Sequence, residues 1–252
     1  MCGTVFTLMV SSASSQELTI AVTSENTSLA SHQSGSEVNS PGLRNIFEVL
    51  ATRDPETNEL MPELATSWSQ INPTTWEFEL RKGVTFHDGS PFNAESAAFS
   101  INWSWSEEQD FPLRQFMATQ ITAEAVGDYT IHVKTVDPDP LIPERMYFTG
   151  IPSMQAVLNN RDTYETQPVG TGPYRLGEWQ RGQYLLLKAN PDWWGLDDPS
   201  VANPQFETVR LMFRSEGGVR ASMVEVGEAN IGMFMDSDQC AQLAAGDGTD
   251  CL

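Results

Sequence analysis

The segment WEFELRKG (residues 76–83) constrains the fold most, because large apolar side chains alternate with charged ones along its first six positions. A period of two places one set of side chains on each face of a β-strand, so this pattern is typical of a strand that is buried on one side only. Lys82-Gly83 then predicts a tight turn, and Val84–Phe86 is expected to pair back as a short strand. His87-Asp88-Gly89 predicts another turn.

A helix is predicted directly after this hairpin. Asn93 is a typical N-cap residue, because its side-chain oxygen can accept a hydrogen bond from the first turn of the helix. The apolar residues that follow recur at helical spacing in two stripes: Ala98, Ile101 and Trp105 in one, and Phe99 and Trp103 in the other. A helix with two apolar sides is expected to be well buried.

Shorter patterns predict the remaining elements. The sequence favours strands at residues 18–22, 129–136, 174–176, 184–188, 208–213 and 229–234, and helices at 43–50 and 219–226. Residues 23–40, which are rich in Ser, Asn and Thr, predict a long loop, and Gly170-Thr171-Gly172-Pro173 predicts a tight turn. This mixture of elements favours an α/β or α+β fold.

The charge balance excludes one class of function. The 252 residues include 34 acidic and 14 basic side chains, which gives a formal net charge of −20. A protein that binds nucleic acid needs basic patches to neutralise phosphate, and this sequence has none. The acidity instead predicts a strongly hydrated surface that keeps the protein soluble.

The first fifteen residues are typical of a secretory signal peptide. Gly3–Val10 is a short apolar run, and the small residues Ser11–Ser15 follow it. The positively charged start of such a peptide is missing, so residues 1–15 are interpreted as a remnant. The apolar run is too short to span a bilayer. This interpretation places the mature protein in the periplasm or outside the cell.

The cysteines allow one disulfide. If Cys2 is removed with the signal peptide, Cys240 and Cys251 remain as a pair that could form a local bridge in an oxidising compartment. The alternative is two unrelated thiols near the end of the chain.

A search for catalytic and cofactor motifs finds none. The three histidines share no metal-ligand spacing, and no HExxH or CxxC motif is present. There is no nucleophile elbow and no phosphate-binding loop. The seven tryptophans fit core packing better than ligand stacking. We therefore expect no catalytic residues, no metal site and no cofactor.

Two long blocks of sequence resemble the family 5 extracellular solute-binding proteins, which are the dipeptide, oligopeptide and nickel binding proteins of ABC importers. The first block is PELATSW (62–68) followed by WEFELRKGVTFHDG (76–89) and the helix start NAES (93–96). The second block is PVGTGPY (168–174) followed by KANPDWWG (188–195) and RASMVEVGEANI (220–231). Trp194 and Asn230 replace the Tyr and Asp that are usual in the family. The resemblance covers residues 17 to 240.

The resemblance implies an α/β fold of the type II periplasmic binding protein class. Residues 16–43 and 151–252 would form a discontinuous first lobe, and residues 44–150 an inserted subdomain. Family members are about twice as long and close two lobes on solute like a hinged clamp. The second lobe would lie beyond Leu252. Within this architecture the quoted motifs would hold the fold together, with Arg81 and His87 in structural roles.

The same resemblance suggests which residues border the solute cleft. One candidate is the loop after the first strand, Thr23, Ser24, Glu25 and Asn26, and the other is the return crossover, Tyr147, Phe148, Thr149 and Gly150. For each segment the alternative is an ordinary surface loop or crossover. Backbone hydrogen bonds and aromatic walls would hold the solute, which would be buried on closure.

The function that follows is capture of a peptide-like solute outside the cytoplasm and its delivery to the membrane permease of an ABC transporter. Two alternatives remain: a solute sensor that reports to a chemoreceptor partner, and a hydrolase built on the same scaffold. The solute is open among di- and oligopeptides, nickel chelates, oligosaccharides and opine-like compounds.

Overall fold

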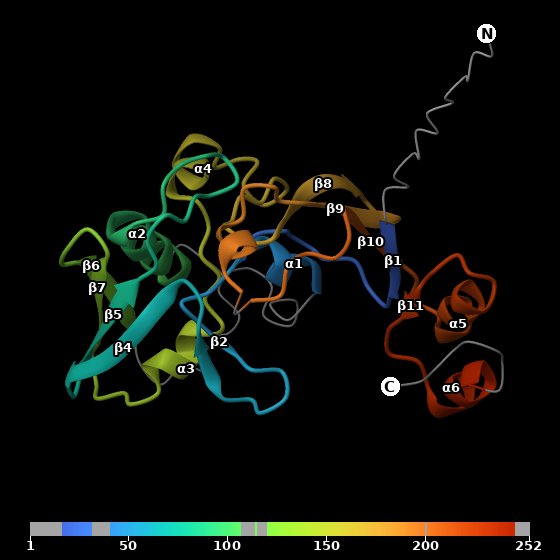
Figure 1. The fold of residues 1–252 in the computed structure, drawn as a ribbon, viewed down its shortest axis with the longest axis horizontal. Coiled ribbons are helices and arrows are strands. Elements are labelled where there is room, and N and C mark those ends of the chain that lie inside the picture. Colours follow the sequence, from blue (N-terminus) through green and yellow to red (C-terminus); the bar gives the residue numbers. More distant parts are fainter. Residues whose placement is uncertain (1–16, 32–40, 107–113, 115–119, 200, 245–252) are drawn as a thin grey trace, which may run out of the picture.

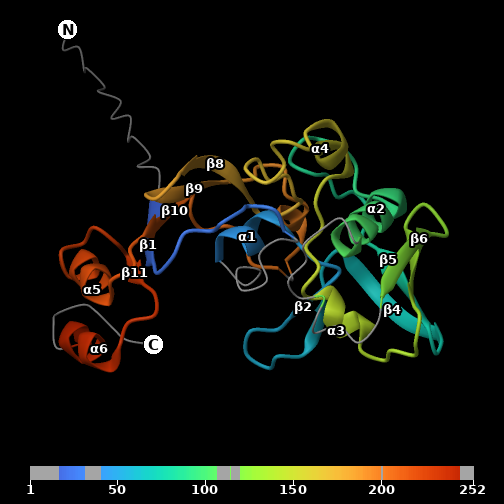
Figure 2. The same cartoon turned by 180° about the vertical axis from the view of Figure 1, so that it is seen from behind.

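The computed structural model describes residues 17–31, 41–106, 114, 120–199 and 201–244. The predicted signal peptide remnant (residues 1–15) and Cys251 lie outside the described residues. The chain forms an elongated molecule in which a five-stranded sheet and a four-stranded sheet lie side by side along the long axis (Figures 1 and 2). Within the described ranges, no helix is both long enough and apolar enough to cross a membrane.

The five-stranded sheet has the strand order β11-β1-β10-β9-β8. Its strands are β1 (Glu17–Val22), β8 (Tyr174–Gln180), β9 (Tyr184–Ala189), β10 (Thr208–Phe213) and β11 (Ile231–Gly232). Strand β1 runs parallel to β10 and β11, whereas β9 is antiparallel to β10 and to β8. The sheet therefore joins residues near the start of the chain to a segment about 190 residues later, as the pairing of Glu17 with Thr208 shows.

The four-stranded sheet is antiparallel throughout and has the order β4-β5-β7-β6. Its strands are β4 (Ala65–Asn72), β5 (Thr75–Leu80), β6 (Ile121–Ala125) and β7 (Thr130–Thr135), and helix α2 (Ala94–Trp105) packs on one face. Phe78, Ile131 and Ile101 are fully buried between the helix and the sheet.

Shorter elements connect and cover the two sheets. They are α1 (Pro41–Ile46), β2 (Ala51–Arg53), β3 (Leu60–Pro62), α3 (Ile142–Met146), α4 (Met154–Asn159), the 3₁₀ turn η2 (Trp194–Asp197), α5 (Gly217–Glu225) and α6 (Ser237–Ala244). In Figure 1, α1 and η2 lie between the sheets, and α5 and α6 form the end of the molecule farthest from the four-stranded sheet.

The predicted helix after the hairpin is confirmed, together with its cap. The Asn93 side chain accepts a hydrogen bond from the Ser96 amide at 2.9 Å, and the Ser96 hydroxyl lies 3.0 Å from the Asn93 amide, which completes a capping box. Ala98, Ile101 and Trp105 are buried in the main core of the four-stranded sheet. The second stripe, Phe99 and Trp103, packs on a separate cluster with Ala30, Val157 and Tyr164. Both apolar sides of the helix are thus covered.

Some of the predicted elements are wrong or incomplete. Val84–Phe86 does not pair back with β5, since its one strand-like contact is a bridge between Thr85 and Pro91. The Val84 and Phe86 side chains are apolar because they fill the core beneath this loop. Helix α1 ends at Ile46, before the predicted Leu50, and the strand expected at 229–234 shortens to β11.

Candidate functional site

Strands β1, β10 and β11 run parallel, so their carboxyl ends lie together, at what we call the carboxyl edge of the sheet. A loop segment follows each of these strands there. Thr23–Asn26 follows β1, Arg214–Glu216 follows β10, and Met233-Phe234 follows β11. In open sheets with parallel strands, ligands bind outside the carboxyl ends of the strands, because the loops that follow those strands converge there. The predicted loop 23–26 therefore lies at the edge where a ligand is expected.

Loop 23–26 is fixed by the hairpin turn between β8 and β9. Arg181 donates to the backbone carbonyl of Asn26 at 3.3 Å and forms an ion pair with Glu25 at 3.6 Å, and the Gly182 amide donates to Glu25 at 2.9 Å. Ser24 is exposed and Thr23 is partly exposed, whereas Asn26 is buried. The buried Asn26 side-chain nitrogen has no hydrogen-bond partner within the described ranges. Thr23 and Ser24 are the members of the loop whose side chains reach the surface most directly.

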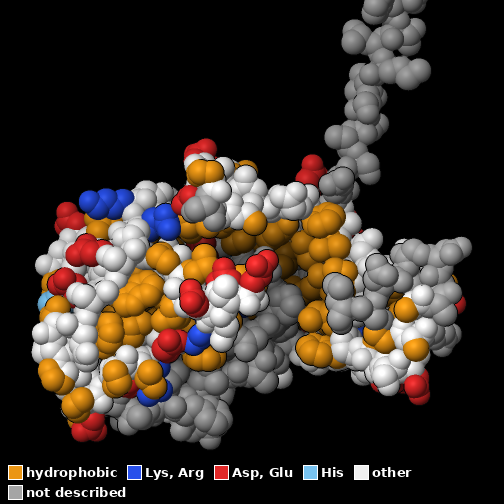
Figure 3. All heavy atoms as spheres, turned by 60° about the horizontal axis from the view of Figure 1, so that its bottom comes forward, with side chains coloured by type: hydrophobic (Ala, Val, Ile, Leu, Met, Phe, Trp, Pro, Cys, Tyr) orange, Lys and Arg blue, Asp and Glu red, His pale blue; other side chains and the backbone are white. Residues whose placement is uncertain are grey.

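Phe234 is an exposed aromatic side chain at the same edge. It is 75% exposed, and its backbone has a φ of +53°, a conformation that costs free energy for a residue other than glycine. The buried Arg220 holds this backbone in place. Its guanidinium donates to the carbonyls of Met233 and Phe234 at 2.8 and 2.7 Å, and to those of Arg214 and Ser215 at 2.7 and 2.8 Å. Hydrophobic side chains also reach the surface near this end of the molecule in Figure 3.

The second predicted segment, residues 147–150, lies against α1. The Arg44 guanidinium carbon is 4.0 Å from the centroid of the Tyr147 ring, and the Phe148 ring meets Tyr147 edge-on with centroids 5.0 Å apart. Tyr147 and Phe148 are half-buried, so each still offers ring surface. Thr149 and Gly150 are buried: the Thr149 hydroxyl accepts from the Trp105 indole at 3.4 Å, and the Gly150 carbonyl accepts from the Ser31 hydroxyl at 3.2 Å.

Arg44 is a functional candidate that the sequence patterns do not reveal. Its Nη2 atom is buried and has no hydrogen-bond partner among the residues that the structure describes, and the residue borders a small hollow lined by Ser31, Leu43, Arg44, Phe47 and Gly150. An unpaired guanidinium donor beside a tyrosine ring suits a carboxylate with an apolar neighbour. The segment Tyr147–Gly150 and Arg44 thus form one surface, although they are 103 to 106 positions apart in sequence.

Two carboxyl groups lie directly behind this surface. Glu48 is 2% exposed and accepts hydrogen bonds from the indoles of Trp193 (3.0 Å) and Trp194 (2.9 Å). Burial and the nearby Glu63 raise the pKa of Glu48 to about 8. Burial also raises the pKa of Glu63 to about 7, although its hydrogen bond from the Val49 amide and the charges of Arg44 and Arg81 act in the opposite direction.

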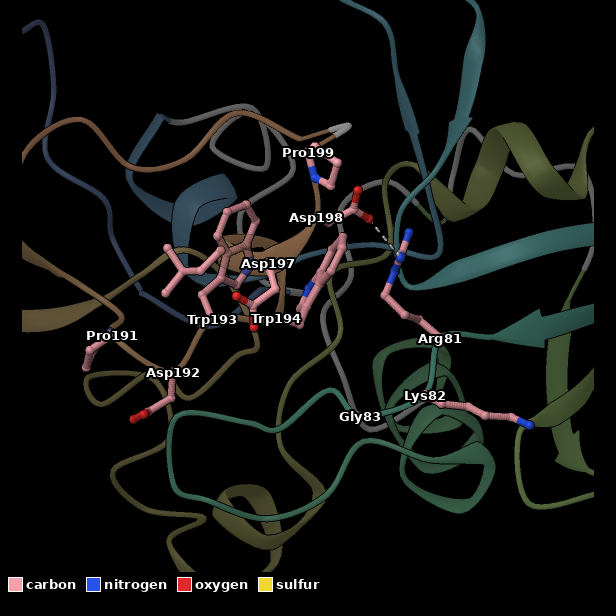
Figure 4. Close-up of a pocket in the computed structure, with 11 residues that line it drawn as sticks. Arg81, Lys82, Gly83, Pro191, Asp192, Trp193, Trp194, Asp197, Asp198 and Pro199 are labelled. Carbon is pink, nitrogen blue, oxygen red and sulfur yellow. Dashed lines mark hydrogen bonds and ion pairs between the residues drawn. The ribbon is translucent and has the colours of Figure 1, made fainter.

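A hollow of about 720 Å³ lies beside the two tryptophans (Figure 4). Arg81 is one of the residues that line this hollow. Its guanidinium lies 3.9 Å from the Trp194 ring centroid, forms an ion pair with Asp198 at 3.3 Å and donates a hydrogen bond to the Glu63 carbonyl at 2.9 Å. Both indole N–H groups and the Nε and Nη1 donors of Arg81 are thus already bonded within the protein. These contacts support the structural role expected for Arg81.

The two motif blocks are joined through His87. Its amide donates to the Gly170 carbonyl at 2.9 Å, its Nε2 atom lies 3.0 Å from the Gly172 carbonyl, and the Gly170 amide donates to Nδ1 at 3.4 Å. This pattern requires a neutral ring with its proton on Nε2. Burial lowers the pKa of His87, which favours the same state. These contacts support the structural role expected for His87.

The predicted disulfide has one described member. Cys240, in α6, is disulfide-bonded, but Cys251 lies outside the described residues, so the pairing of these two cysteines stays a prediction. Among the residues that the structure describes, no three His, Cys, Asp or Glu side chains are grouped to hold a metal ion.

Comparison with known proteins assigns this fold and sequence to a family. Residues 59–250 match the model described as "Bacterial extracellular solute-binding proteins, family 5 Middle". A curated relative, the probable ABC transporter periplasmic-binding protein SapA of Escherichia coli, is 28% identical over 210 residues, which cover 73% of this chain and 37% of SapA.

Solved structures show the same fold. The dipeptide-binding protein of Pseudoalteromonas sp. SM9913, in complex with Met-Leu, has a TM-score of 0.82 at 21% identity and covers 92% of this chain and 50% of its own. NikZ from Campylobacter jejuni, in complex with Ni(L-His), has a TM-score of 0.80 at 20% identity, covering 92% of this chain and 45% of its own.

These structures identify the fold as the type II periplasmic binding protein class that the sequence predicts. The chain spans about half the length of the solved structures and 37% of the length of SapA. The family match covers most of the chain, including the blocks around His87 and Gly172 that hold the two sheets together. The chain therefore belongs to the bacterial extracellular solute-binding proteins of family 5.

Proposed function

We propose that this chain captures a peptide-like solute outside the cytoplasm, in the periplasm or at the cell exterior, and presents it to the membrane permease of an ABC importer. The match of residues 59–250 to a family of solute-binding proteins carries the proposal. SapA is named as a periplasmic-binding protein of an ABC transporter, and the structural relative from Pseudoalteromonas holds a dipeptide, Met-Leu. Both support the assignment of a peptide-like solute.

The surface proposed to receive the solute combines the two predicted segments with two further side chains. Tyr147 and Phe148 supply aromatic walls, and the backbone around Thr149 and Gly150 supplies the floor next to Arg44. Thr23, Ser24, Glu25 and Asn26 line the carboxyl edge of the sheet, where Phe234 adds an exposed ring. Apolar walls with a few oriented polar groups are the usual composition of a small-ligand site.

Within this surface, Arg44 is proposed to pair with a carboxylate of the solute. Its buried Nη2 donor has no partner, and an unmet buried donor costs about 1–3 kcal/mol that a bound carboxylate would recover. The ring of Tyr147 already fixes the orientation of the guanidinium, so little side-chain entropy is lost on binding. A free peptide supplies such a carboxylate at its C-terminus.

The domain division inferred from sequence is also proposed. Residues 16–43 and 151–252 would form the first lobe, around the five-stranded sheet, and residues 44–150 the inserted subdomain, around the four-stranded sheet. The separate cores of the two sheets support this division. At the boundaries, Ile46 and Phe47 pack in the first core and Ile151 packs in the second.

The proposal is tested by isothermal titration of the full chain with a mixture of di- to pentapeptides. The wild type is expected to give saturable heat, and Arg44→Gln to weaken binding by about tenfold or more. Arg210→Gln is the matched control, because Arg210 also lies over a tyrosine ring, that of Tyr184 at 4.5 Å, but pairs with Glu17 on the sheet. Equal affinity in wild type and Arg44→Gln would contradict the assigned site.

A further inference from the structure

A second hollow, of about 630 Å³, runs along the free edge of the five-stranded sheet. Strand β8 is the last strand in the sheet order, so its outer edge has no strand partner among the described strands. The hollow lies between β8 and residues 166–169, and His87-Asp88 close one side. None of the side chains proposed to receive the solute lines this hollow.

The hollow contains one cation, Arg175, that has no partner among the described residues. Arg175 forms no hydrogen bond, ion pair or ring contact with any other residue that the structure describes, whereas the other described arginine side chains have at least one of these. Lys188 lies opposite Arg175 across the β8–β9 pair, and its side chain passes next to Gly177, since a Cβ on Gly177 would come within 3.1 Å of its Cγ. In a chain with a net charge of −20, two adjacent cations without acidic partners among the described residues are unusual.

An apolar wall and a second arginine complete the lining. Leu176 and Trp179 both face the core of the sheet, because the β-bulge at Gly177 resets the alternation between them. The Arg181 guanidinium covers the Trp179 ring at 3.7 Å from its centroid, and its side chain is 56% exposed. The Trp179 indole nitrogen beneath it is buried and has no hydrogen-bond acceptor.

The acidic residue on the rim, Asp88, keeps its negative charge, because hydrogen bonds lower its pKa, but it forms no ion pair with Arg175 in the described structure. Both oxygens of Asp88 are occupied within the protein, since the Ser90 hydroxyl donates to one at 2.6 Å and the Ser153 hydroxyl to the other at 2.6 Å. His87 donates its Nε2 proton to the Gly172 carbonyl and carries no charge in this arrangement. The hollow therefore presents a guanidinium that no described residue pairs with, next to an apolar wall.

We propose that this hollow binds a small organic anion, whose carboxylate or phosphate group pairs with Arg175 and whose apolar part lies on Leu176 and Trp179. A planar guanidinium matches the two oxygens of either anion and forms charge-assisted hydrogen bonds with them. The apolar wall favours an organic anion over an inorganic one. This site is separate from the solute surface at Arg44, so the proposal can be tested independently of the proposed peptide binding.

The experiment titrates the full chain with 4-phenylbutyrate, phenyl phosphate, acetate and inorganic phosphate, and follows binding by NMR of the tryptophan indole N–H signals. Both phenyl probes are expected to bind saturably and to shift the Trp179 signal, assigned with Trp179→Phe. The phenyl probe with the lower Kd shows whether the site prefers a carboxylate or a phosphate group. Acetate and inorganic phosphate are expected to bind more weakly.

Arg175→Gln is expected to weaken binding of the phenyl probes by about tenfold or more, and Arg161→Gln, which removes an exposed arginine that lies over Trp103, is expected to leave it unchanged. Peptide binding should be unaffected by Arg175→Gln, which separates the two sites. If no probe binds at millimolar concentration, or if Arg175→Gln binds the phenyl probes as well as the wild type does, the proposal is overturned.

Discussion

His87 and Gly172 join the two sheets: the His87 Nε2 atom lies 3.0 Å from the Gly172 carbonyl, 85 positions away in sequence. The turn at His87 follows the four-stranded sheet's β5, and Gly172 precedes β8 of the five-stranded sheet. A hydrogen bond between two segments so far apart in sequence holds the relative position of the two cores, and the proposed solute surface between α1 and residues 147–150 depends on that position.

His87→Ala is expected to lower the free energy of unfolding by about 1–3 kcal/mol, because it leaves the Gly172 carbonyl and the Gly170 amide without this partner. The His87 side chain should also contribute a loss of stability as the pH falls below about 6.5, against the gain that Glu48 and Glu63 contribute over the same range, so its effect is read as the difference between the wild type and His87→Ala. Since burial lowers the pKa of His87 in the folded state, the unfolded chain takes up the proton first as the pH falls. Urea denaturation of both proteins at pH 7.5 and 5.5 measures both effects, and an equal change in unfolding free energy on acidification in the wild type and His87→Ala would contradict the assignment.

Gly172→Ala is expected to destabilise the protein by about 3 kcal/mol or more. An added Cβ would lie 2.4 Å from the backbone carbonyl oxygen of Asn45, and backbone atoms cannot move aside as the end of a flexible side chain can. Gly218→Ala is the control, because no atom lies within 4 Å of its Cβ and the residue is in helix α5. The control should be unchanged or more stable by up to about 1 kcal/mol. Thermal unfolding of both variants distinguishes these outcomes.

The wild type is expected to lose unfolding free energy as the pH rises from 5 to 8.5, and Glu48→Gln is expected to make this loss smaller. Because the pKa of Glu48 is raised to about 8 in the folded state, the unfolded chain releases the proton first as the pH rises. The wild type should therefore lose stability across this range, by roughly 2 kcal/mol or more from this group. A glutamine side chain at this position cannot ionise, and Glu63, which loses its like-charged neighbour, still contributes its own part of the pH dependence. Parallel urea curves at pH 5 and 8.5 for the two proteins provide the comparison; identical pH dependence would show that Glu48 is ionised throughout.

Asn93→Ala is expected to cost about 1 kcal/mol of unfolding free energy, because helix α2 loses the acceptor for the Ser96 amide. Asn93→Asp should restore most of this stability, since a carboxylate accepts the same hydrogen bond. Chemical denaturation measures the difference, and a loss in Asn93→Asp as large as that in Asn93→Ala would show that the cap is not the cause.

Local patterns predict the elements whose periodicity is visible in the sequence. Strands β1, β5, β7, β9 and β10 and helix α2 lie where alternation or helical spacing places them. Strand β4 escapes prediction because most of its side chains are polar and exposed, so it lacks an apolar period. The prediction for Val84–Phe86 is wrong because apolar residues also fill the core beneath irregular loops, and periodicity cannot separate the two cases over three residues.

The site is predictable only in part. The resemblance to a family predicts that Tyr147–Gly150 and the loop after β1 border the solute cleft. The structure adds a further candidate residue near each of them, Arg44 and Phe234 respectively. Arg44 and Phe234 carry no local signal, because their roles depend on partners elsewhere in the sequence: Tyr147 for Arg44, and Arg220, fourteen positions earlier, for the strained backbone of Phe234. Glu48 likewise looks like any helix-end glutamate until Trp193 and Trp194, about 145 positions later, enclose it.

The central proposal, that this chain is a receptor for solute, is tested most directly by thermal-shift measurement against a panel of peptides, nickel chelates, oligosaccharides and opine-like compounds, with mass spectrometry of each mixture. A ligand that binds only the folded state must raise the melting temperature by mass action. We expect a saturable increase with peptides, recovered unchanged, and a smaller increase in Arg44→Gln. Product formed from any compound, or no increase with any class, would contradict the claim.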